Sequence, residues 1–288
     1  MSVSLADRIA AAPISWGVCE APDWGYEIPA ERVLSEMGSL GVRATELGPT
    51  GYLGDGPGQV RELLERHGLR LVGGFLPVVL HVERADLGEA DDAMRTLADA
   101  GAEMVVLAAR SVDGSYERRV PLDDTEWGTL LANLDRVRDL AGEHGLPVSV
   151  HPHVGTAIEG REAVLRLLDA SEVALCLDTG HLLIGGTDPL QLVRSVADRV
   201  AHVHLKDVRA SWARTALEGS YVGAVRQGLY APLGDGDLDI AGIVAALQAV
   251  DYQGWYVLEQ DCALDGPPRL GAGPVDDVRR SIEFLAKL

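Results

Sequence analysis

The segment from residue 173 to residue 206 decides the fold, because it contains a strand, a helix and a second strand. Val173–Asp178 reads Val-Ala-Leu-Cys-Leu-Asp, and Val200–Lys206 reads Val-Ala-His-Val-His-Leu-Lys. Such nearly continuous apolar runs are typical of parallel strands that are covered on both faces. Pro189–Ala197, between them, has the apolar spacing of an amphipathic helix. The segment therefore predicts a β–α–β unit.

The same alternation runs along the whole chain. The expected strands are Pro13–Val18, Arg43–Leu47, Arg70–Pro77, Met104–Ala109, Pro147–His151, Val173–Asp178, Val200–Lys206 and Trp255–Glu259. The expected helices are Ala30–Leu40, Val60–His67, Ala90–Ala100, Trp127–His144, Glu162–Ala170, Pro189–Ala197, Ile240–Val250 and Val275–Leu288. Several helices end at a glycine, which is a common helix stop. Strand–helix pairs of roughly 35 residues predict an α/β fold, a (β/α)8 TIM barrel that forms one domain over residues 1–288.

A doubly wound open sheet is the alternative fold. It would usually carry a glycine-rich dinucleotide loop after the first strand, and Trp16-Gly17-Val18-Cys19 does not have that pattern. The longest interruption lies between the seventh strand and its helix, at about residues 208–238. Loops that follow barrel strands lie at the catalytic face, so we expect this long loop to be a lid or a wall of the site.

Composition excludes several classes of function. The 288 residues include 25 Lys and Arg against 44 Asp and Glu, a formal net charge of −19. Such acidity argues against nucleic acid and anionic membranes as partners, and so against a DNA-repair nuclease. No apolar run is long enough to span a membrane, and no signal peptide is evident. The three cysteines are far apart, which excludes a disulfide framework and predicts a cytoplasmic protein. The oligomeric state stays open, a homo-oligomer included.

Polar residues gather at the predicted strand ends, where TIM barrels place their reactive groups. Five of the eight histidines fall at the ends of the fifth, sixth and seventh strands: His151, His153, His181, His202 and His204. Imidazole and carboxylate groups on neighbouring strands can converge on one divalent ion. We therefore predict a metal site made of His151, Asp178, His204 and Glu259. The alternative is a set of core histidines and surface acids.

Two ambiguities remain within the histidine pairs. Strand alternation points His202 and His204 to the same side, and His204, nearer the strand end, is predicted to reach the metal while His202 lies in a deeper layer. His153 follows His151 by two residues, so either of these two could be the ligand. We assign the ligand role to His151 and a substrate contact to His153.

The order of these blocks resembles the xylose-isomerase-like TIM barrel superfamily. The matching stretches include Pro13-Ile14-Ser15-Trp16-Gly17, His151-Pro152-His153-Val154-Gly155-Thr156, Asp178-Thr179-Gly180-His181 and His202-Val203-His204-Leu205-Lys206-Asp207-Val208-Arg209. Within the superfamily the chain looks most like the inosose dehydratases of myo-inositol breakdown. His151 stands where most of the superfamily has a glutamate. The third strand ends in Phe75-Leu76-Pro77 where the dehydratases tend to have a tryptophan.

The resemblance implies a metal-dependent lyase. Its substrate would be a keto-inositol such as scyllo-inosose (2-keto-myo-inositol), dehydrated through an enediolate that the ion stabilises. Mn²⁺ or Co²⁺ suits the mixed ligands, with Zn²⁺ and Mg²⁺ as alternatives. An isomerase or epimerase of a keto-sugar or keto-inositol could use the same platform. A sugar-binding protein is the non-enzymatic alternative.

The remaining predicted site residues are assigned from their positions. Lys206 and His181 are the predicted proton-handling pair, and a metal ion nearby would depress the pKa of Lys206. The alternative is that Lys206 pairs with Asp178 or Asp207. Three further substrate contacts are predicted: Trp16 as a flat wall, Glu46 as an acceptor for substrate hydroxyls, and Arg209 as a contact or a lid anchor. Trp16 could instead pack in the core, and Glu46 could pair with an arginine.

Overall fold

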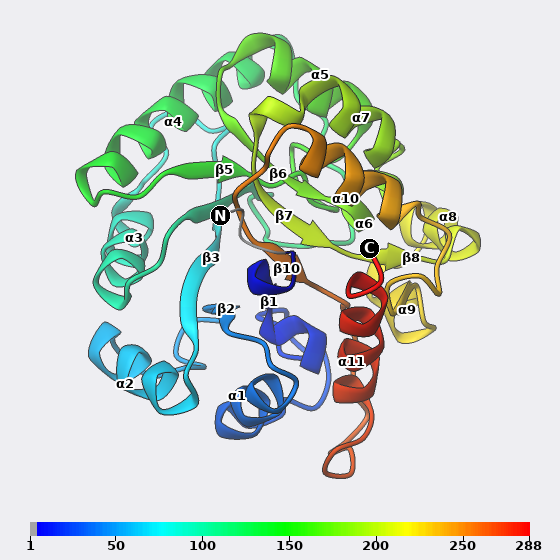
Figure 1. The fold of residues 1–288 in the computed structure, drawn as a ribbon. Helices are drawn as coiled ribbons and strands as arrows, with labels where there is room; N and C mark the ends of the chain where they lie inside the picture. The colour runs from blue at the N-terminus through cyan, green and yellow to red at the C-terminus, as the bar shows by residue number, and fades with distance from the viewer. Residues whose placement is uncertain (1–4) are drawn as a thin grey trace.

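Eight parallel strands close into a barrel in the order β1-β10-β7-β6-β5-β4-β3-β2. The computed structural model describes residues 5–288, and its helices surround the strands in a ring (Figure 1). The barrel strands are β1 (Ile9–Ala11), β2 (Ala44–Glu46), β3 (Arg70–Val78), β4 (Val105–Ala109), β5 (Val148–Val150), β6 (Ala174–Asp178), β7 (Val200–Leu205) and β10 (Tyr256–Leu258). The predicted TIM barrel is therefore confirmed.

The helices of the ring follow the predicted positions. They are α1 (Ala30–Ser39), α2 (Pro57–His67), α3 (Gly88–Ala100), α4 (Asp124–Glu143), α5 (Arg161–Ala170), α7 (Pro189–Val196), α10 (Ile240–Ala249) and α11 (Pro274–Leu285). Glycine ends α2 and α3 as expected: Gly68 and Gly101 have φ angles of 66° and 89°. This left-handed conformation is costly for a residue with a Cβ. No helix among residues 5–288 is long and apolar enough to cross a membrane.

The prediction for the first strand was wrong by several residues. Residues 13–16 form a 3-10 turn, and the strand is the earlier run Ile9–Ala11. Pro13 has no N–H for a strand ladder and sits instead at the first position of the turn. Alanine has a low strand propensity, which conceals the true strand in the sequence. Burial outweighs that propensity, because Ala10 and Ala11 are fully buried.

Strand register brings the polar strand ends together. Asp178 on β6 pairs with His204 on β7, and His204 pairs with Val257 on β10. Glu259 follows β10 directly, and its N–H donates to Leu205 O of β7. The side chains that end β6, β7 and β10 therefore lie side by side at one mouth of the barrel.

The segment at about residues 208–238 contains short elements of its own. They are α8 (Ala210–Glu218), α9 (Tyr221–Arg226) and a two-stranded antiparallel sheet of β8 (Asp207–Val208) with β9 (Tyr230–Ala231). The buried Asp207 carboxylate accepts hydrogen bonds from the N–H groups of Gly234, Gly236 and Leu238. A carboxylate that holds several backbone donors fixes the path of a loop. The return of this segment toward α10 is therefore anchored at the end of β7.

Candidate active site

A cavity of about 650 Å³ lies at the C-terminal ends of the barrel strands. Its inner part is lined by the residues of the strand ends and by one residue of α9: Glu46, Phe75, His151, His153, His204, Lys206, Tyr221, Glu259 and Asp261. TIM barrels bind their substrates at this end. The cavity is large enough for a six-membered polyhydroxylated ring.

Three predicted metal ligands lie close together, and two of them, His204 and Glu259, line this cavity. One ligand atom each from Asp178, His204 and Glu259 lies within 4.8 Å of the other two, and all three residues are buried. His204 Nδ1 is 3.1 Å from Glu259 Oε2 and 3.5 Å from Asp178 Oδ2. Ligands about 2.1 Å from one ion lie roughly 3–4 Å apart, so these separations suit a shared divalent cation.

His151, and not His153, joins these groups. His151 Nε2 lies 3.2 Å from Asp178 Oδ2, and His151 shares candidate metal groups with Asp178 and with His204. His153 belongs to no candidate group among residues 5–288. Its Nδ1 donates to Val154 O at 2.7 Å, which leaves its Nε2 as an acceptor. The geometry favours His151 as a ligand and His153 as a substrate contact.

The charges of the cluster also suit a divalent cation. Glu46, Asp178, Glu259 and Asp261 are all buried, and Lys206 is the one lysine or arginine among the buried residues of the described chain. With neutral histidines, four carboxylates against one ammonium leave an excess of negative charge, which is costly at low dielectric. Burial opposes protonation of His204, but Cys176, Glu259 and Glu46 raise its pKa well above the usual value. The buried carboxylates therefore stabilise a positive charge at His204, either a proton on its ring or a bound cation beside it.

Glu46 contacts two histidines instead of an arginine. Its Oε1 accepts hydrogen bonds from His202 Nε2 at 2.7 Å and from His204 Nε2 at 2.9 Å. Burial alone would raise the pKa of Glu46, but His204 and His202 hold it well below the usual value. A proton on His204 Nε2 leaves Nδ1 as the ring nitrogen that can bind a metal. Glu46 thus orients His204, and it also contacts His202, which pairs with Cys176 one step back along the strand and does not line the cavity.

Lys206 and His181 form a close pair. Lys206 Nζ lies 3.0 Å from His181 Nε2, and Asp261 Oδ1 and Glu259 Oε2 are 2.8 Å and 3.1 Å from the same ammonium. The expected depression of the Lys206 pKa depends on a divalent ion nearby, and the protein groups alone act in the opposite direction. Burial lowers that pKa, but Asp178, Asp261 and Glu259 outweigh burial and raise it well above the usual value. The predicted alternative pairing of Lys206 with Asp178 is also present, at 3.5 Å.

His181 is held in its neutral form. Burial, and then the nearby His153 and Lys206, lower the pKa of His181 well below the usual value. Its backbone N–H donates to Asp178 Oδ1 at 2.8 Å, which caps the short helix α6 (Thr179–Ile184). The His153 ring lies against the His181 ring, with centroids 3.8 Å apart. Lys206 borders the cavity, whereas His181 is not among the residues that line it.

The glycine between these groups permits their close approach. A Cβ atom at Gly180 would lie 2.8 Å from Lys206 Cβ and 2.9 Å from the Tyr230 ring. Real Cβ atoms essentially never lie that close to other heavy atoms. The Asp-Thr-Gly-His block therefore needs glycine at this position so that α6 can pack directly against the end of β7.

Comparisons with known proteins agree with the fold. A profile of the xylose isomerase-like TIM barrel family matches residues 34–288. The chain belongs to this family. An inosose dehydratase of Geobacillus kaustophilus is 34% identical over 279 residues, which cover 90% of each protein. The rhizopine catabolism protein MocC of Rhizobium meliloti is 34% identical over 270 residues, covering 88% of this chain and 81% of that protein.

Solved structures with the same fold superpose along nearly the whole chain. A probable 3-DHS dehydratase of Bacillus anthracis has a TM-score of 0.71 at 15% identity, covering 97% of this chain and 98% of that one. A 3-keto-D-glucoside 4-epimerase of E. coli has a TM-score of 0.68 at 16% identity, covering 98% and 99%. At these identities the likeness shows the xylose isomerase-like fold alone.

Two of the predicted substrate contacts lie outside the cavity of this xylose isomerase-like barrel. The Trp16 side chain is fully buried, and its Nε1–H donates to Glu36 Oε2 at 2.9 Å, as in the packing alternative. Arg209 Nη1 donates to Gly228 O at 2.6 Å and to Tyr230 O at 3.0 Å. The contacts of Arg209 are those of an anchor for the segment that carries α8 and α9.

Sequence reasoning missed three polar residues of the site. Tyr221 OH donates to Asp261 Oδ2 at 2.7 Å and lies 3.0 Å from Tyr230 OH. Asp261 follows Glu259 by two residues, so strand alternation could have placed it on the same side. Tyr221 and Tyr230 had no such signal, because they belong to the segment after β7, whose path only the folded chain defines.

Proposed function

We propose that this protein is a metal-dependent hydro-lyase that dehydrates a keto-inositol such as scyllo-inosose. The observation that carries the proposal is the cluster of Asp178, His204 and Glu259 ligand atoms beside the Lys206–His181 pair, because His204, Glu259 and Lys206 all line the same cavity. The similarity to inosose dehydratases supports the choice of substrate. The polar inner lining suits the hydroxyl groups of such a ring.

The metal would be held by His151, Asp178, His204 and Glu259. A divalent ion at this position supplies Lewis-acid stabilisation of the negative charge that develops on the substrate's oxygens. Mn²⁺ or Co²⁺ suits a mixed imidazole and carboxylate set, with Zn²⁺ and Mg²⁺ as alternatives. Glu46 keeps His204 in the orientation that this set requires.

Lys206 would exchange protons with the substrate, because its ammonium borders the cavity. Dehydration breaks the C–H bond next to the carbonyl and the C–O bond at the following carbon, and the released proton leaves in the water that forms. His181, whose Nε2 lies 3.0 Å from Lys206 Nζ, would exchange a proton with Lys206 during the cycle. Asp178 and Glu259 favour the ammonium form less strongly when their charge is shared with an ion. The freed amine can then accept the α-proton and deliver it to the departing hydroxyl.

His153 and Glu46 would contribute to substrate binding. His153 lines the cavity with Nε2 as an acceptor, because its Nδ1–H is already bonded to Val154 O. Glu46 also borders the cavity, although its Oε1 is occupied by two imidazoles. Phe75 lies against the rings of His151 and His153, with centroid distances of 5.8 Å and 5.5 Å, and gives the ring of the substrate an apolar surface.

The test is turnover of scyllo-inosose by protein that has been stripped with a chelator. The protein is reloaded separately with Mn²⁺, Co²⁺, Zn²⁺ or Mg²⁺, and the dione product is followed by mass spectrometry. We expect turnover that depends on the added ion. Absence of product with every metal would overturn the proposed dehydratase activity.

The same assay separates the alternative functions. An isomerase or epimerase would incorporate deuterium from D2O into the substrate without loss of water. A sugar-binding protein would keep its affinity for the ligand after chelation or in the His204→Ala variant.

A further inference from the structure

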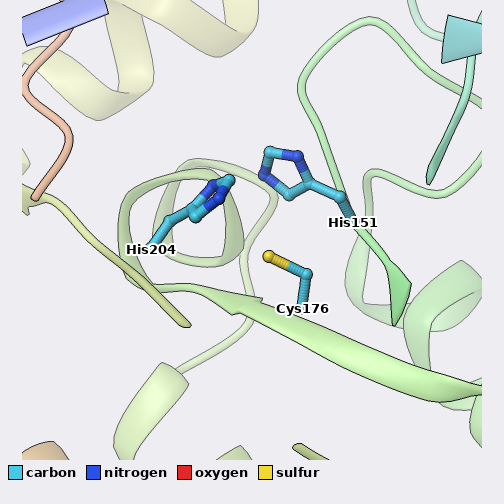
Figure 2. Close-up of side chains that lie close together, drawn as sticks. All are labelled: His151, Cys176 and His204. Atoms are coloured by element: carbon cyan, nitrogen blue, oxygen red, sulfur yellow. The ribbon is translucent and has the colours of Figure 1, made fainter. Parts of the chain in front are cut away.

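The buried thiol of Cys176 lies beside two of the imidazoles of the site. One ligand atom each from His151, Cys176 and His204 lies within 4.8 Å of the other two, and all three residues are buried. Figure 2 shows the Cys176 sulfur directed toward the space between the two rings. The ring centroids are 4.8 Å apart, and their planes are nearly perpendicular, at 83°.

Each of the two imidazoles has one buried nitrogen without a hydrogen bond. Nε2 of His151 is bonded to Asp178, and Nε2 of His204 is bonded to Glu46. Nδ1 of each ring is fully buried and makes no hydrogen bond, and Nδ1 of His204 lies 3.1 Å from the Glu259 carboxylate. A buried nitrogen without a hydrogen bond lowers the stability of the fold. In a neutral imidazole one nitrogen donates a hydrogen bond, and the other carries a lone pair. Once a metal ion displaces the imidazole protons, nitrogens of the two rings and the thiol form a set of soft ligands.

We propose that His151, Cys176 and His204 form a site for a thiophilic metal ion such as Cd²⁺ or Cu⁺. Thiolate and imidazole together select soft or borderline ions, whereas the carboxylates of Asp178 and Glu259 favour harder ones such as Mn²⁺. Binding forms a metal–sulfur bond and breaks the S–H bond, whose proton leaves to solvent. Cys176 is not a ligand of the proposed catalytic metal. A site that includes this thiol therefore goes beyond the proposed function.

The two sets exclude each other, because His151 and His204 belong to both. An ion bound to Cys176 and these imidazoles removes them from the set with Asp178 and Glu259. Thiophilic ions would therefore compete with Mn²⁺ and inhibit the protein. This competition rests on the proposed function, whereas binding through sulfur does not.

The test uses the full-length, metal-free protein titrated with Cd²⁺. Coordination by a thiolate gives an ultraviolet sulfur-to-metal charge-transfer absorption, which oxygen and nitrogen ligands do not give. We expect this absorption to saturate at one ion per chain and to disappear in the Cys176→Ser variant. The matched control is the Cys19→Ser/Cys262→Ser double variant, which keeps the single thiol of the cluster and should keep the absorption. Prior loading with Mn²⁺ should weaken Cd²⁺ binding.

X-ray absorption spectroscopy of the cadmium-loaded wild type keeps the test independent of how well the variant folds. A shell with one sulfur among lighter ligands is expected. Absence of sulfur from the shell, or an absorption that persists in Cys176→Ser, would overturn the proposal. These readouts require no turnover, so failure of the dehydratase assay and failure of the cadmium site are separate results.

Discussion

Glu46 Oε1 lies 2.9 Å from His204 Nε2, although 158 residues separate them in the chain. The bond joins β2 to β7 across the interior of the barrel and determines which imidazole nitrogen faces Asp178 and Glu259. Carboxylates that orient a metal-binding histidine typically change metal affinity when they are replaced.

Replacement of Glu46 by glutamine is expected to weaken Mn²⁺ binding by roughly 10–100-fold. The amide keeps the shape of the side chain but loses the charge that favours a proton on His204 Nε2. Calorimetric titration of the metal-free variant measures the effect. Glu31→Gln is the control, because Glu31 is exposed and contacts Arg66 and His67 far from the cavity. Equal affinity in Glu46→Gln and wild type would show that Glu46 does not position the ligand.

Removal of the Lys206 ammonium tests the proton transfer itself. Lys206→Met keeps the length of the side chain against Tyr230 but cannot carry a proton. We expect kcat to fall by roughly 10²-fold or more while the metal content is retained. Elemental analysis of the purified variant supplies the metal content. Near-normal kcat in fully metal-loaded protein would exclude Lys206 from the chemistry.

His181→Ala is expected to lower kcat on a similar scale, roughly 10²-fold, because Lys206 loses the neutral base at 3.0 Å. The truncated side chain leaves a space beside the His153 ring. Added imidazole should therefore restore part of the activity in a concentration-dependent way. A purely structural role for His181 would give lower stability without such rescue, as thermal unfolding and kinetics measured together would show.

Tyr221→Phe tests the polar contact between α9 and the strand ends. Its hydroxyl is bonded to Asp261 Oδ2, and Asp261 Oδ1 lies 2.8 Å from Lys206 Nζ. Loss of one hydrogen bond to a charged group predicts a kcat roughly tenfold lower, with little change in KM. Tyr52→Phe is the matched control, since Tyr52 donates to Ile28 O at 2.7 Å and does not line the cavity. An equal fall in kcat in both variants would argue against a specific role for Tyr221.

The rate at which the Cys262 thiol is alkylated should keep rising at a pH where the rate for an ordinary thiol is already constant. Burial, and then the charges of Asp261 and Asp277, raise the pKa of this thiol to about 12. In a Cys19→Ser/Cys176→Ser variant, the rate of alkylation of the native protein should rise about tenfold per pH unit and keep rising beyond pH ~9, where an ordinary thiol levels off. Mass spectrometry after timed quenching gives the rates. A plateau near pH ~9 would contradict the raised pKa.

The alternation of strand and helix was sufficient to predict the barrel, because each apolar run is long enough to be buried on both faces. The same pattern predicted that strand ends such as Asp178 and His204 would meet, since parallel strands place their carboxyl ends at one face. The first strand was misplaced because alanine-rich Ile9–Ala11 has a weak local signal, whereas Pro13–Val18 has a strong one. Local propensity yields to tertiary packing at such positions.

By itself, the sequence determined which strands carry polar ends and on which side of each strand those ends lie. Only the tertiary structure decided which atoms meet across the barrel: Glu46 with His204, Tyr221 with Asp261, and Cys176 with His151. Strand alternation has a period of two along one chain and contains no information on the distance between opposite strands. That distance depends on barrel closure, on the path of the segment after β7 and on side-chain rotamers, all of which are set by packing in three dimensions.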